Sequence, residues 1–429
     1  MSDVQNVNIV VCGHIHHGKS TLIGRMLVEL KQVHKKALAE AQAFMEQFGN
    51  RTTGNLYATL MARLPSEKEQ GMSYVPSHAR IAVGEDRVVT LIDTPGHSAY
   101  KRARAYGMFM ADLALLVVSA HEGIQEQTGE ALWFAKGMGV PLAGAVITKT
   151  DLANEEMVQR VAEDIRTAVA AHGVRLLTSR LPVLSCSALR DDQIAPILKF
   201  VKELGIERQA SRGPLRFCVQ GRQELFKLTS VGAIALGVVE SGVLLQGDNI
   251  LLEPASYLAK RDIVARVKDL ELARGRNEPK GSAISLAVPR DIVSVLMSMS
   301  WPELERHLTK GGVLSHVYDR IRVANAIDAE ITVIKKPMGA RVGWEPYVLG
   351  HVMGVSGRIS EIYEVREEGG GWTPASQSFV PEGTQARARI TFARPIPFED
   401  TSTLPRMARF TMREHNDIAA IGVCTRIVE

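Results

Sequence analysis

The residue types and spacing of the stretch GHIHHGKS, from Gly13 to Ser20, indicate that it binds phosphate groups. It fits the pattern GxxxxGK[ST] between an aliphatic run and an amphipathic segment, as a phosphate-binding loop requires. Glycines at both ends let backbone N–H groups turn toward a polyphosphate at the start of a helix, where the helix dipole also favours negative charge. We therefore expect Lys19 to reach the β- and γ-phosphates and the Ser20 hydroxyl to coordinate Mg²⁺.

The same stretch contains three histidines, His14, His16 and His17, which could instead indicate a metal site. Side chains between the two glycines of such a loop mostly point away from the phosphates. No further cluster of Cys, His or carboxylate residues lies nearby to complete a set of ligands. We therefore expect that the three imidazoles do not converge on a metal ion.

A second segment with matching chemistry is DTPGH, which follows the aliphatic run RVVTLID. Asp93 would end that strand, where an acidic residue can hold Mg²⁺ through water. Gly96 can offer its N–H group to a γ-phosphate. The segment is therefore predicted to contact the Mg²⁺ ion and the γ-phosphate of the nucleoside triphosphate that the glycine-rich loop binds.

Two further segments, TKTD and SAL, follow later strands and point to the base. The first places Thr148, Lys149 and Asp151 after a strand, and the second places Ser187 and Ala188 after the next one. A carboxylate at position 151 can accept two hydrogen bonds from the guanine edge, which adenine cannot supply. Each segment alone is weak, but all of them in this order predict a guanine nucleotide.

The elements that must position these residues follow from the hydrophobic pattern. Through about Leu204, short aliphatic runs alternate with longer amphipathic stretches. The runs that predict strands are VNIVVC, RVVTLID, LALLVVSA, LAGAVIT and LPVLSC. A helix is predicted over EEMVQRVAEDIRTAVAAH. This alternation predicts an α/β domain with a mostly parallel sheet covered by helices.

A polar stretch from Gly205 to Pro214 ends that pattern. After it, short strands separated by glycine turns predict a small antiparallel barrel and then a second β block. The stretch from Met299 to Gly312 interrupts the first β block and predicts a short helix. We expect domains at residues 1–208, 213–318 and 321–429.

The composition of the 429 residues is that of a globular protein with a net charge of +4, which permits an anionic partner such as RNA. Cys12, Cys186, Cys218 and Cys424 are far apart and form no CxxC pair, so we expect neither a disulfide framework nor a zinc knuckle. We expect no membrane partner, because the longest apolar runs have the length of a strand. A reducing, cytoplasmic location fits these features best.

Taken in order, the motifs resemble those of the translational GTPases, the group with elongation factor Tu, elongation factor 1-alpha and the GTPase subunit of sulfate adenylyltransferase. The resemblance extends over essentially the whole chain. It implies a P-loop GTPase domain followed by two antiparallel β-barrels, with GTP, GDP and Mg²⁺ as ligands. The implied reaction is hydrolysis of GTP to GDP and phosphate.

The resemblance also assigns residues of the two switches. EKEQGMS, Glu67 to Ser73, is similar to a first switch that usually reads ERERGIT or EREQGIT. Ser73 then stands where a threonine supplies a hydroxyl to Mg²⁺. His97 is similar to the histidine that orients the attacking water, and Ile15 and Met72 are similar to its hydrophobic gate.

The residues that the motifs and the resemblance together assign to the nucleotide are Gly13, His14, Ile15, His16, His17, Gly18, Lys19, Ser20, Thr21, Gly96, Thr148, Lys149, Asp151, Ser187, Ala188 and Leu189. Ser20, Ser73 and Asp93 are expected at Mg²⁺. His97 is the expected catalytic residue.

The chain departs from the family pattern at two positions of the loop and the base segment. The family loop usually reads GHVDHGKS or GSVDDGKS, so His16 replaces an aspartate. This replacement removes a negative charge that, by the resemblance, helps to hold a cation near the phosphates. Thr148 replaces the asparagine of NKxD, while Asp151 is retained. Because no arginine of the loop or first switch is obviously placed to act, we expect slow hydrolysis without a partner.

The ligand carried by the protein has three interpretations. VGWEPYVLGHV and the ending ARFTMRE…AAIGV are similar to stretches of elongation factors, which favours an aminoacyl-tRNA-like ligand and a tRNA or ribosome-linked partner. STLIGRMLVELK and EKEQGMS closely match the GTPase subunit of sulfate adenylyltransferase, which would imply a partner protein subunit. A specialised paralogue with another protein partner is the third interpretation. We favour the first.

A basic run at Lys101, Arg102 and Arg104 bears on the same question. Such a run is most often a solvated helix face. If RNA binds, these side chains are candidates for phosphate contacts.

Overall fold

The computed structural model describes residues 6–48, 55–62, 65–70, 73–74, 76–83, 87–97, 100–190, 193–206, 213–220, 226–228, 232–273, 282–308, 312–366, 370–375, 379–415 and 417–428. The chain divides into two compact units. The first comprises Met1–Lys136, Val140–Gln209 and Ala273–Ser282, and the second comprises Gly137–Gly139, Ala210–Leu272 and Ala283–Glu429. Among the described residues, the structure has no helix with the length and apolar character needed to cross a membrane.

A six-stranded sheet forms the centre of the first unit, with strand order β2-β3-β1-β4-β5-β6. Its strands are β1 (Val7–Cys12), β2 (Ser77–Val83), β3 (Arg87–Asp93), β4 (Leu113–Ser119), β5 (Leu142–Thr148) and β6 (Val183–Ser185). All neighbours in this order are parallel except the edge strand β2, which is antiparallel to β3. Every residue of β4 and β5 is buried, which explains their continuous aliphatic sequences. The predicted α/β fold with a mostly parallel sheet is confirmed.

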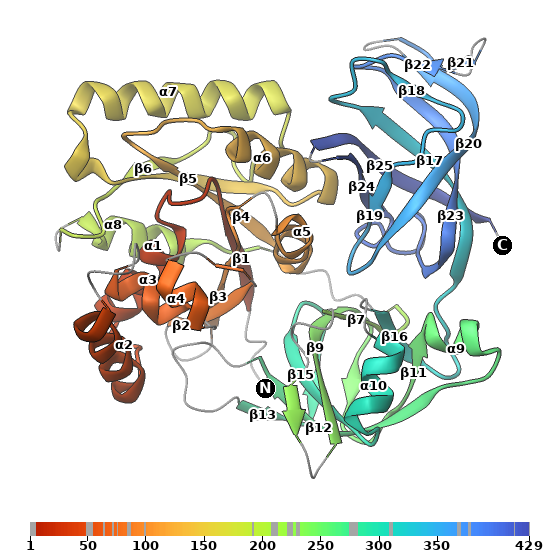
Figure 1. Cartoon of the computed structure of the whole chain (residues 1–429), viewed down its shortest axis with the longest axis horizontal. Helices are drawn as coiled ribbons and strands as arrows, with labels where there is room; N and C mark the ends of the chain where they lie inside the picture. Colours follow the sequence, from red (N-terminus) through yellow and green to blue (C-terminus); the bar gives the residue numbers. More distant parts are fainter. Residues whose placement is uncertain are drawn as a thin grey trace. The chain divides into compact units, whose positions relative to one another are not determined.

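Helices cover both faces of this sheet (Figure 1). They include α1 (Lys19–Glu29), α5 (Lys101–Met110), α6 (Glu126–Met138), α7 (Glu155–His172) and α8 (Ala195–Glu203). Leu22 of α1 and Ile197 of α8 share one core with Ile9 of β1. Figure 1 shows α6 and α7 on the opposite side of the sheet. α7 spans the predicted helix, because the side chain of Asn154 caps its first turn and Gly173 ends it in a left-handed conformation.

Three helices between α1 and β2 were not predicted from the sequence: α2 (Lys35–Phe48), α3 (Leu56–Met61) and α4 (Pro65–Gln70). Asn55 caps α3, since its Oδ1 accepts a hydrogen bond from the Ala58 N–H at 2.9 Å. Arg25 of α1 donates to the Tyr57 hydroxyl at 2.8 Å. These contacts attach α3 to α1, beside the glycine-rich loop. A short 3₁₀ helix, η2 (Thr150–Leu152), follows β5.

Two closed β-barrels make up most of the second unit. The first barrel has strand order β11-β16-β7-β9-β15-β12 and closes through pairing of β11 with β12. The second has order β19-β24-β25-β17-β23-β20 and closes through pairing of β19 with β20. All of these pairings are antiparallel. The two antiparallel barrels implied by the resemblance are confirmed, whereas the domain boundaries given above remain a prediction.

The elements of the first barrel and its surroundings are β7 (Arg216–Val219), β8 (Phe226–Leu228), β9 (Gly232–Ser241), β10 (Leu244–Leu245), β11 (Asn249–Glu253), α9 (Ala255–Ala259), β12 (Val264–Leu272), β13 (Ser282–Ile284), β14 (Leu286–Ala287), β15 (Ile292–Met297), α10 (Trp301–Leu308) and β16 (Gly312–His316). The helix α10 confirms the short helix predicted in this region.

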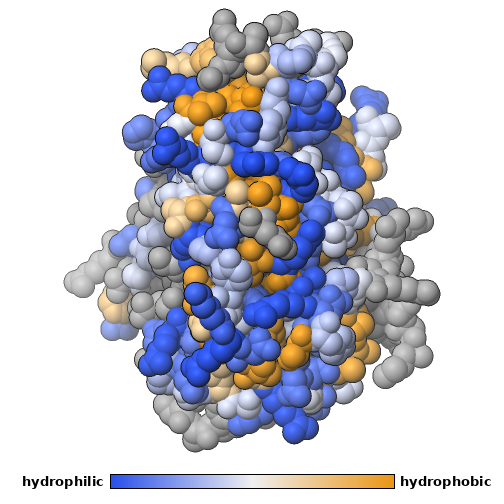
Figure 2. Space-filling view, turned by 90° about the vertical axis from the view of Figure 1, so that its right-hand side faces the viewer, coloured by the Kyte–Doolittle hydropathy of each residue, from blue (hydrophilic) through white to orange (hydrophobic). Residues whose placement is uncertain are grey.

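The elements of the second barrel and its surroundings are β17 (Val323–Val333), β18 (Ala340–Arg341), β19 (Tyr347–Leu349), β20 (Gly354–Arg366), β21 (Thr373–Pro374), β22 (Phe379–Val380), β23 (Gln385–Pro397), β24 (Arg409–Glu414) and β25 (Asp417–Val428). Strands of both barrels alternate buried and more exposed residues, as β12 and β23 do. On the face in Figure 2, hydrophobic residues accordingly form small groups between hydrophilic side chains.

Buried ion pairs join the two barrels. Arg216 of β7 donates from Nε to Glu399 Oε1 at 2.6 Å, and their side chains are 5% and 2% exposed. Arg406, whose side chain is 29% exposed, forms a second pair with the buried Glu240 of β9 at 2.9 Å. Removing both charges from water has a large cost, which their attraction offsets only while both partners are present. Loss of Glu399 therefore leaves the buried Arg216 charge with only the more distant carboxylate of Asp319, at 3.9 Å.

We predict that Glu399→Gln lowers the free energy of unfolding by about 3 kcal/mol, because it leaves the Arg216 charge buried without its carboxylate. Denaturant titration followed by circular dichroism measures the change. The matched control is Asp417→Asn, which removes an exposed pair with Lys335 whose side chains are 57% and 46% exposed. Exposed pairs contribute below about 1 kcal/mol. Equal losses in the two variants would contradict this role for the buried pair.

Candidate nucleotide-binding site

The glycine-rich loop connects β1 to α1 at the carboxyl end of the parallel strands. Gly13 has a φ of 142°, and a Cβ atom there would lie 2.2 Å from the carbonyl oxygen of Val117 in β4. Gly18, with a φ of 88°, directly precedes α1, and His16 between them has a φ of 60°. The backbone therefore reverses sharply on top of the sheet, and the free N–H groups of the first turn of α1 face the loop.

Lys19 extends back under this loop and is buried, with 6% exposure. Its Nζ donates to the carbonyl oxygen of His14 at 2.6 Å. A Cβ atom on Gly96 would lie 2.5 Å from the same Nζ and 2.6 Å from the backbone nitrogen and Cα of Ile15, and the backbone contacts leave room only for glycine beside the ammonium group. Burial lowers the pKa of Lys19 from 10.5 to about 8, against the opposing effect of the Asp93 carboxylate.

Oxygen atoms of Ser20, Ser73 and Asp93 converge at the start of α1. Asp93 Oδ2 accepts hydrogen bonds from Ser20 Oγ at 2.7 Å and from Ser73 Oγ at 3.2 Å. The two hydroxyl oxygens are 3.1 Å apart. Burial raises the pKa of Asp93 to about 6. Its Oδ1 is buried without a hydrogen-bond partner among the described residues, so this carboxylate keeps capacity for another ligand.

The segment after β5 is tied to the loop by side chains. Thr148 Oγ1 donates to the carbonyl oxygen of His17 at 2.6 Å. Lys149 has a φ of 58°, and its Nζ donates to Glu122 Oε1 at 2.9 Å. Thr148 thus holds the end of β5 against the loop through its hydroxyl.

The segments after β5 and β6 are joined by Gln193. Its Oε1 accepts hydrogen bonds from the Ser187 N–H at 2.7 Å and from Thr150 Oγ1 at 3.0 Å. Ser187 Oγ in turn accepts from the Leu189 N–H at 3.2 Å. Asp151 lies in η2, directly after β5, on the segment that Gln193 joins to Ser187.

A cavity of about 490 Å³ lies among these groups. The predicted residues that line it are Ile15, His16, Gly18, Lys19, Ser20, Thr21, Ser73, Gly96, His97, Thr148, Lys149, Asp151, Ser187, Ala188 and Leu189. The structure therefore brings together side chains from the loop, both switches and both base segments. Of the predicted residues, Gly13, His14, His17 and Asp93 are not part of this lining.

Four lining residues were not predicted: Asn55, Ala58, Thr94 and Leu152. Thr94 and Leu152 directly follow Asp93 and Asp151, so their position in the motifs could have indicated them. Asn55 donates from Nδ2 to Thr21 Oγ1 at 3.1 Å, but it belongs to the unpredicted helical insertion and had no signal in the sequence. The other predicted gate residue, Met72, lies outside the described residues.

The three histidines of the loop do not all lie together, and a carboxylate that was not foreseen lies beside two of them. His16 lines the cavity, whereas the rings of His14 and His17 lie 4.9 Å apart away from it. Glu122 completes a group in which one ligand atom from each of the three residues lies within 4.8 Å of the others. The expectation that no carboxylate lies nearby was wrong, because Glu122 comes from the distant segment that follows β4.

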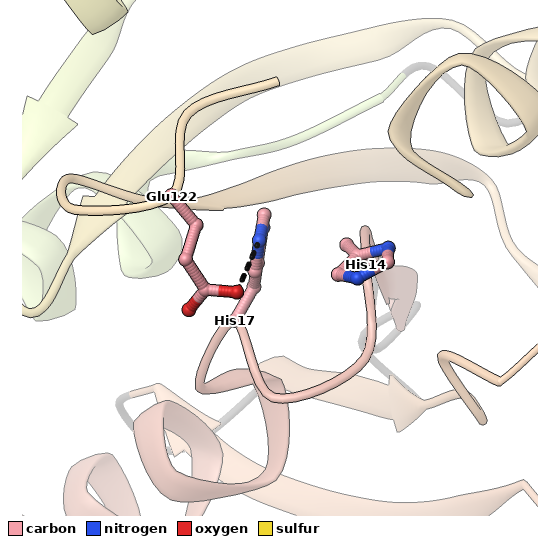
Figure 3. Close-up of side chains that lie close together, drawn as sticks. All are labelled: His14, His17 and Glu122. Atoms are coloured by element: carbon pink, nitrogen blue, oxygen red, sulfur yellow. Dashed lines mark ion pairs between the residues drawn. The ribbon is translucent and has the colours of Figure 1, made fainter. Parts of the chain in front are cut away.

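Figure 3 shows the His17 ring directed at the Glu122 carboxylate, with His14 on the same loop. The contact joins His17 Nε2 to Glu122 Oε2 over 3.7 Å, which is too long for a hydrogen bond. Burial lowers the pKa of His17 to about 3, although Glu122 opposes this shift.

Arg104, a candidate for phosphate contacts, is buried with 5% exposure. Its Nη2 donates to Glu130 Oε2 at 2.6 Å, and its guanidinium lies over the ring of Phe134. This arginine is therefore part of the packing of α5 against α6. It is not available on a solvated face.

Comparison with known proteins agrees with this geometry. The chain matches the elongation factor Tu GTP binding domain over residues 4–205 and the GTP-eEF1A C-terminal domain-like family over residues 326–425. Elongation factor 1-alpha of Thermococcus celer is 25% identical over 441 residues, with 98% of each chain covered.

Similar folds are found in solved structures. The Ski7 GTPase-like domain of S. cerevisiae, bound to GTP, has a TM-score of 0.78 and 14% identity, and 98% of this chain and 97% of that chain are covered. A bacterial selenocysteine-specific elongation factor has a TM-score of 0.70 and 19% identity over 98% of this chain. The present chain spans 58% of that protein's length. Because family models match the GTPase domain and the second barrel, and the similarity to elongation factor 1-alpha covers 98% of the chain, the chain belongs to the translational GTPases of the elongation factor Tu and elongation factor 1-alpha group, a family of GTP hydrolases.

Proposed function

We propose that this GTPase is a GTP-switched carrier of an aminoacyl-tRNA-like ligand. The observation that carries the proposal is the match of residues 326–425 to the C-terminal domain of elongation factor 1-alpha. This match shows that the similarity to elongation factors includes a β-barrel as well as the GTPase domain. A GTPase domain alone would say little, because proteins with many different functions contain one. The similarity of the whole chain to the elongation factor of Thermococcus celer supports the same function.

In this proposal the cavity holds the nucleotide, with its phosphates at the loop. Backbone N–H groups after Gly13 and at the start of α1 bind the phosphate oxygens, and the Lys19 ammonium neutralises their charge. In this proposal the Lys19 ammonium keeps its hydrogen bond to the His14 carbonyl oxygen when the nucleotide is bound. Little reorganisation is then needed when the phosphates enter.

The residues at the start of α1 fit a bound Mg²⁺ ion. Ser20, Ser73 and Asp93 offer hard oxygen ligands, and the buried Asp93 Oδ1 has no hydrogen-bond partner in the described part of the chain. When bound there, Mg²⁺ would neutralise charge on the β- and γ-phosphates.

The base is proposed to lie beside Asp151, whose carboxylate accepts two hydrogen bonds from guanine. Leu152 and Leu189 line the same part of the cavity and are 60% and 69% exposed. A planar base would cover these apolar side chains and so add a contribution that does not depend on which purine is bound. Discrimination among purines then depends on the Asp151 carboxylate.

We predict that Asp151→Asn weakens GDP binding by about 100-fold, because two hydrogen bonds to a charged acceptor are lost. Xanthosine diphosphate should gain affinity, since its edge presents an acceptor where guanine has an amino group. Equilibrium titration with a fluorescent nucleotide and competing diphosphates measures both effects.

The matched control for this substitution is Glu155→Gln in the first turn of α7, outside the cavity lining. It should leave both affinities unchanged. Equal ATP and GTP affinity in the unaltered protein would contradict the role of Asp151.

His97 is proposed to orient the attacking water. It lines the cavity next to Gly96, and its ring lies 6.1 Å from that of Tyr100. We predict that His97→Ala lowers the single-turnover rate of GTP hydrolysis by about 100-fold, the size typical of positioned acid, base or orienting groups. The affinity for GDP should change little, because the phosphate-binding backbone is intact.

The control is His34→Ala, an exposed histidine that is absent from the cavity lining. The rate of GTP hydrolysis by His34→Ala should equal that of the unaltered protein, both without a partner and with a partner that stimulates hydrolysis. An unchanged rate for His97→Ala under both conditions would refute the assignment.

The ligand is tested by recovering the chain from its own cells, locked with a non-hydrolysable GTP analogue. We predict that small RNA of tRNA size accompanies it and dissociates steeply as salt rises, because phosphate contacts release counterions. The GDP-bound chain, treated in the same way, should retain less RNA.

Two outcomes would overturn this function. Recovery of a stoichiometric adenylyl-transferring protein without RNA would assign the chain to sulfate activation. Retention of another protein partner and no RNA, at low salt, would instead favour a specialised paralogue.

A further inference from the structure

His14 and His17 of the glycine-rich loop and Glu122 form a group of side chains that lie close together (Figure 3). None of the three side chains belongs to the cavity lining. The ligand atoms of all three lie within 4.8 Å of one another. They come from two segments that the fold brings together, the loop after β1 and the segment after β4.

The polar atoms of this group lack partners that a buried imidazole normally has. His17 is completely buried, and neither of its ring nitrogens has a hydrogen-bond partner in the described part of the chain. The same holds for Nδ1 of His14. A buried nitrogen without a partner costs stability, so a ligand bound at this position would offset that cost.

Glu122 is oriented toward this position by a second interaction. Its Oε1 accepts a hydrogen bond from Lys149 Nζ at 2.9 Å, and its Oε2 lies 3.7 Å from His17 Nε2. One oxygen is thereby held while the other faces the imidazoles. Orientation of a ligating group by an outer hydrogen bond is a regular feature of metal sites.

We propose that His14, His17 and Glu122 bind a Zn²⁺ ion behind the glycine-rich loop. Two imidazoles and one carboxylate are a ligand set that zinc accepts, with water at a fourth position. Imidazole nitrogen selects zinc over Mg²⁺, which prefers oxygen ligands. The Glu122 side chain is 35% exposed, which gives an ion and its water a route from solvent.

The observed spacing is close to the spacing that zinc requires. With bond lengths of about 2.0–2.1 Å, two ligands on a tetrahedral ion lie about 3.3 Å apart. The His17–Glu122 distance of 3.7 Å needs a small contraction, and the ligand atom of His14 lies within 4.8 Å of both. His14 is only half-buried, so its side chain has room to move.

The site would act on the loop through its backbone. The carbonyl oxygen of His14 accepts from Lys19, and that of His17 accepts from Thr148. A metal ion that fixes both side chains would therefore restrain the two carbonyl groups that position the phosphate-binding lysine and the end of β5. Binding of Zn²⁺ at these three residues depends only on the geometry of the loop, and it does not depend on which ligand the barrels carry.

The test uses the full chain without a histidine tag, saturated with GDP and excess Mg²⁺ so that the nucleotide site is filled. Zn²⁺ is titrated in competition with a chromophoric chelator, and Co²⁺ serves as the spectroscopic probe. We expect a single Zn²⁺ per chain, a visible Co²⁺ absorption typical of four-coordinate nitrogen and oxygen ligation, and a rise in Tm with Zn²⁺.

The informative variants are His14→Ala and Glu122→Gln, because substitution of the fully buried His17 could disturb folding. Each should weaken Zn²⁺ binding at least about tenfold and abolish the Co²⁺ absorption. His121→Ala is the matched control, since this exposed histidine adjoins Glu122 but is not in the group. It should bind Zn²⁺ as the unaltered chain does. Circular dichroism and GDP binding without Zn²⁺ show whether each variant is folded.

Several results would overturn the proposal. These are absence of stoichiometric Zn²⁺ binding to the unaltered chain, binding that survives both His14→Ala and Glu122→Gln, and an equal loss in His121→Ala. The first result would leave His17 and Glu122 as a structural contact only. GDP binding is measured separately, so none of these results would affect the assignment of the nucleotide site.

Discussion

The close approach of Gly13 to β4 is the constraint on which the rest of the first unit depends. With a φ of 142° and no room for a side chain before the Val117 carbonyl oxygen, the backbone can leave β1 along only one path. That path sets where α1 begins, and hence where Lys19 and Ser20 lie. The other groups reach the same place because parallel strands all end at one edge of the sheet. Sheet packing therefore determines the site geometry.

The sequence predicted the parts of the fold that follow from local pattern. Strands such as β4 and β5 were evident because both faces are buried and their residues are uniformly aliphatic. The bounds of α7 were predicted from its amphipathic pattern, and the structure shows that Asn154 and Gly173 cap its two ends. The helices α2 to α4 were missed, since α3 and α4 are short and depend on tertiary contacts such as that of Arg25 with Tyr57.

In the candidate site, too, some features could be predicted from the sequence and others could not. Motif residues line one cavity as expected, because each motif directly follows a strand of the sheet. The direction of side chains within the loop could not be read from spacing, so the meeting of His17 with Glu122 was missed. The substitution at Thr148 became interpretable only in the structure. Its short hydroxyl reaches the loop because the His17 carbonyl oxygen lies just 2.6 Å away.

The buried pair between Arg216 and Glu399 has a consequence for how the chain is made. Its two members are separated by 183 residues. During synthesis the whole first barrel leaves the ribosome well before Glu399 exists, so Arg216 emerges on a barrel face that is still open to solvent. The face of the first barrel that carries Arg216 must therefore remain exposed to solvent, without aggregating, until the second barrel has folded. Folding of this unit during synthesis therefore ends when the second barrel docks on the first. Arg216 lies on the face of the first barrel that the second barrel then covers.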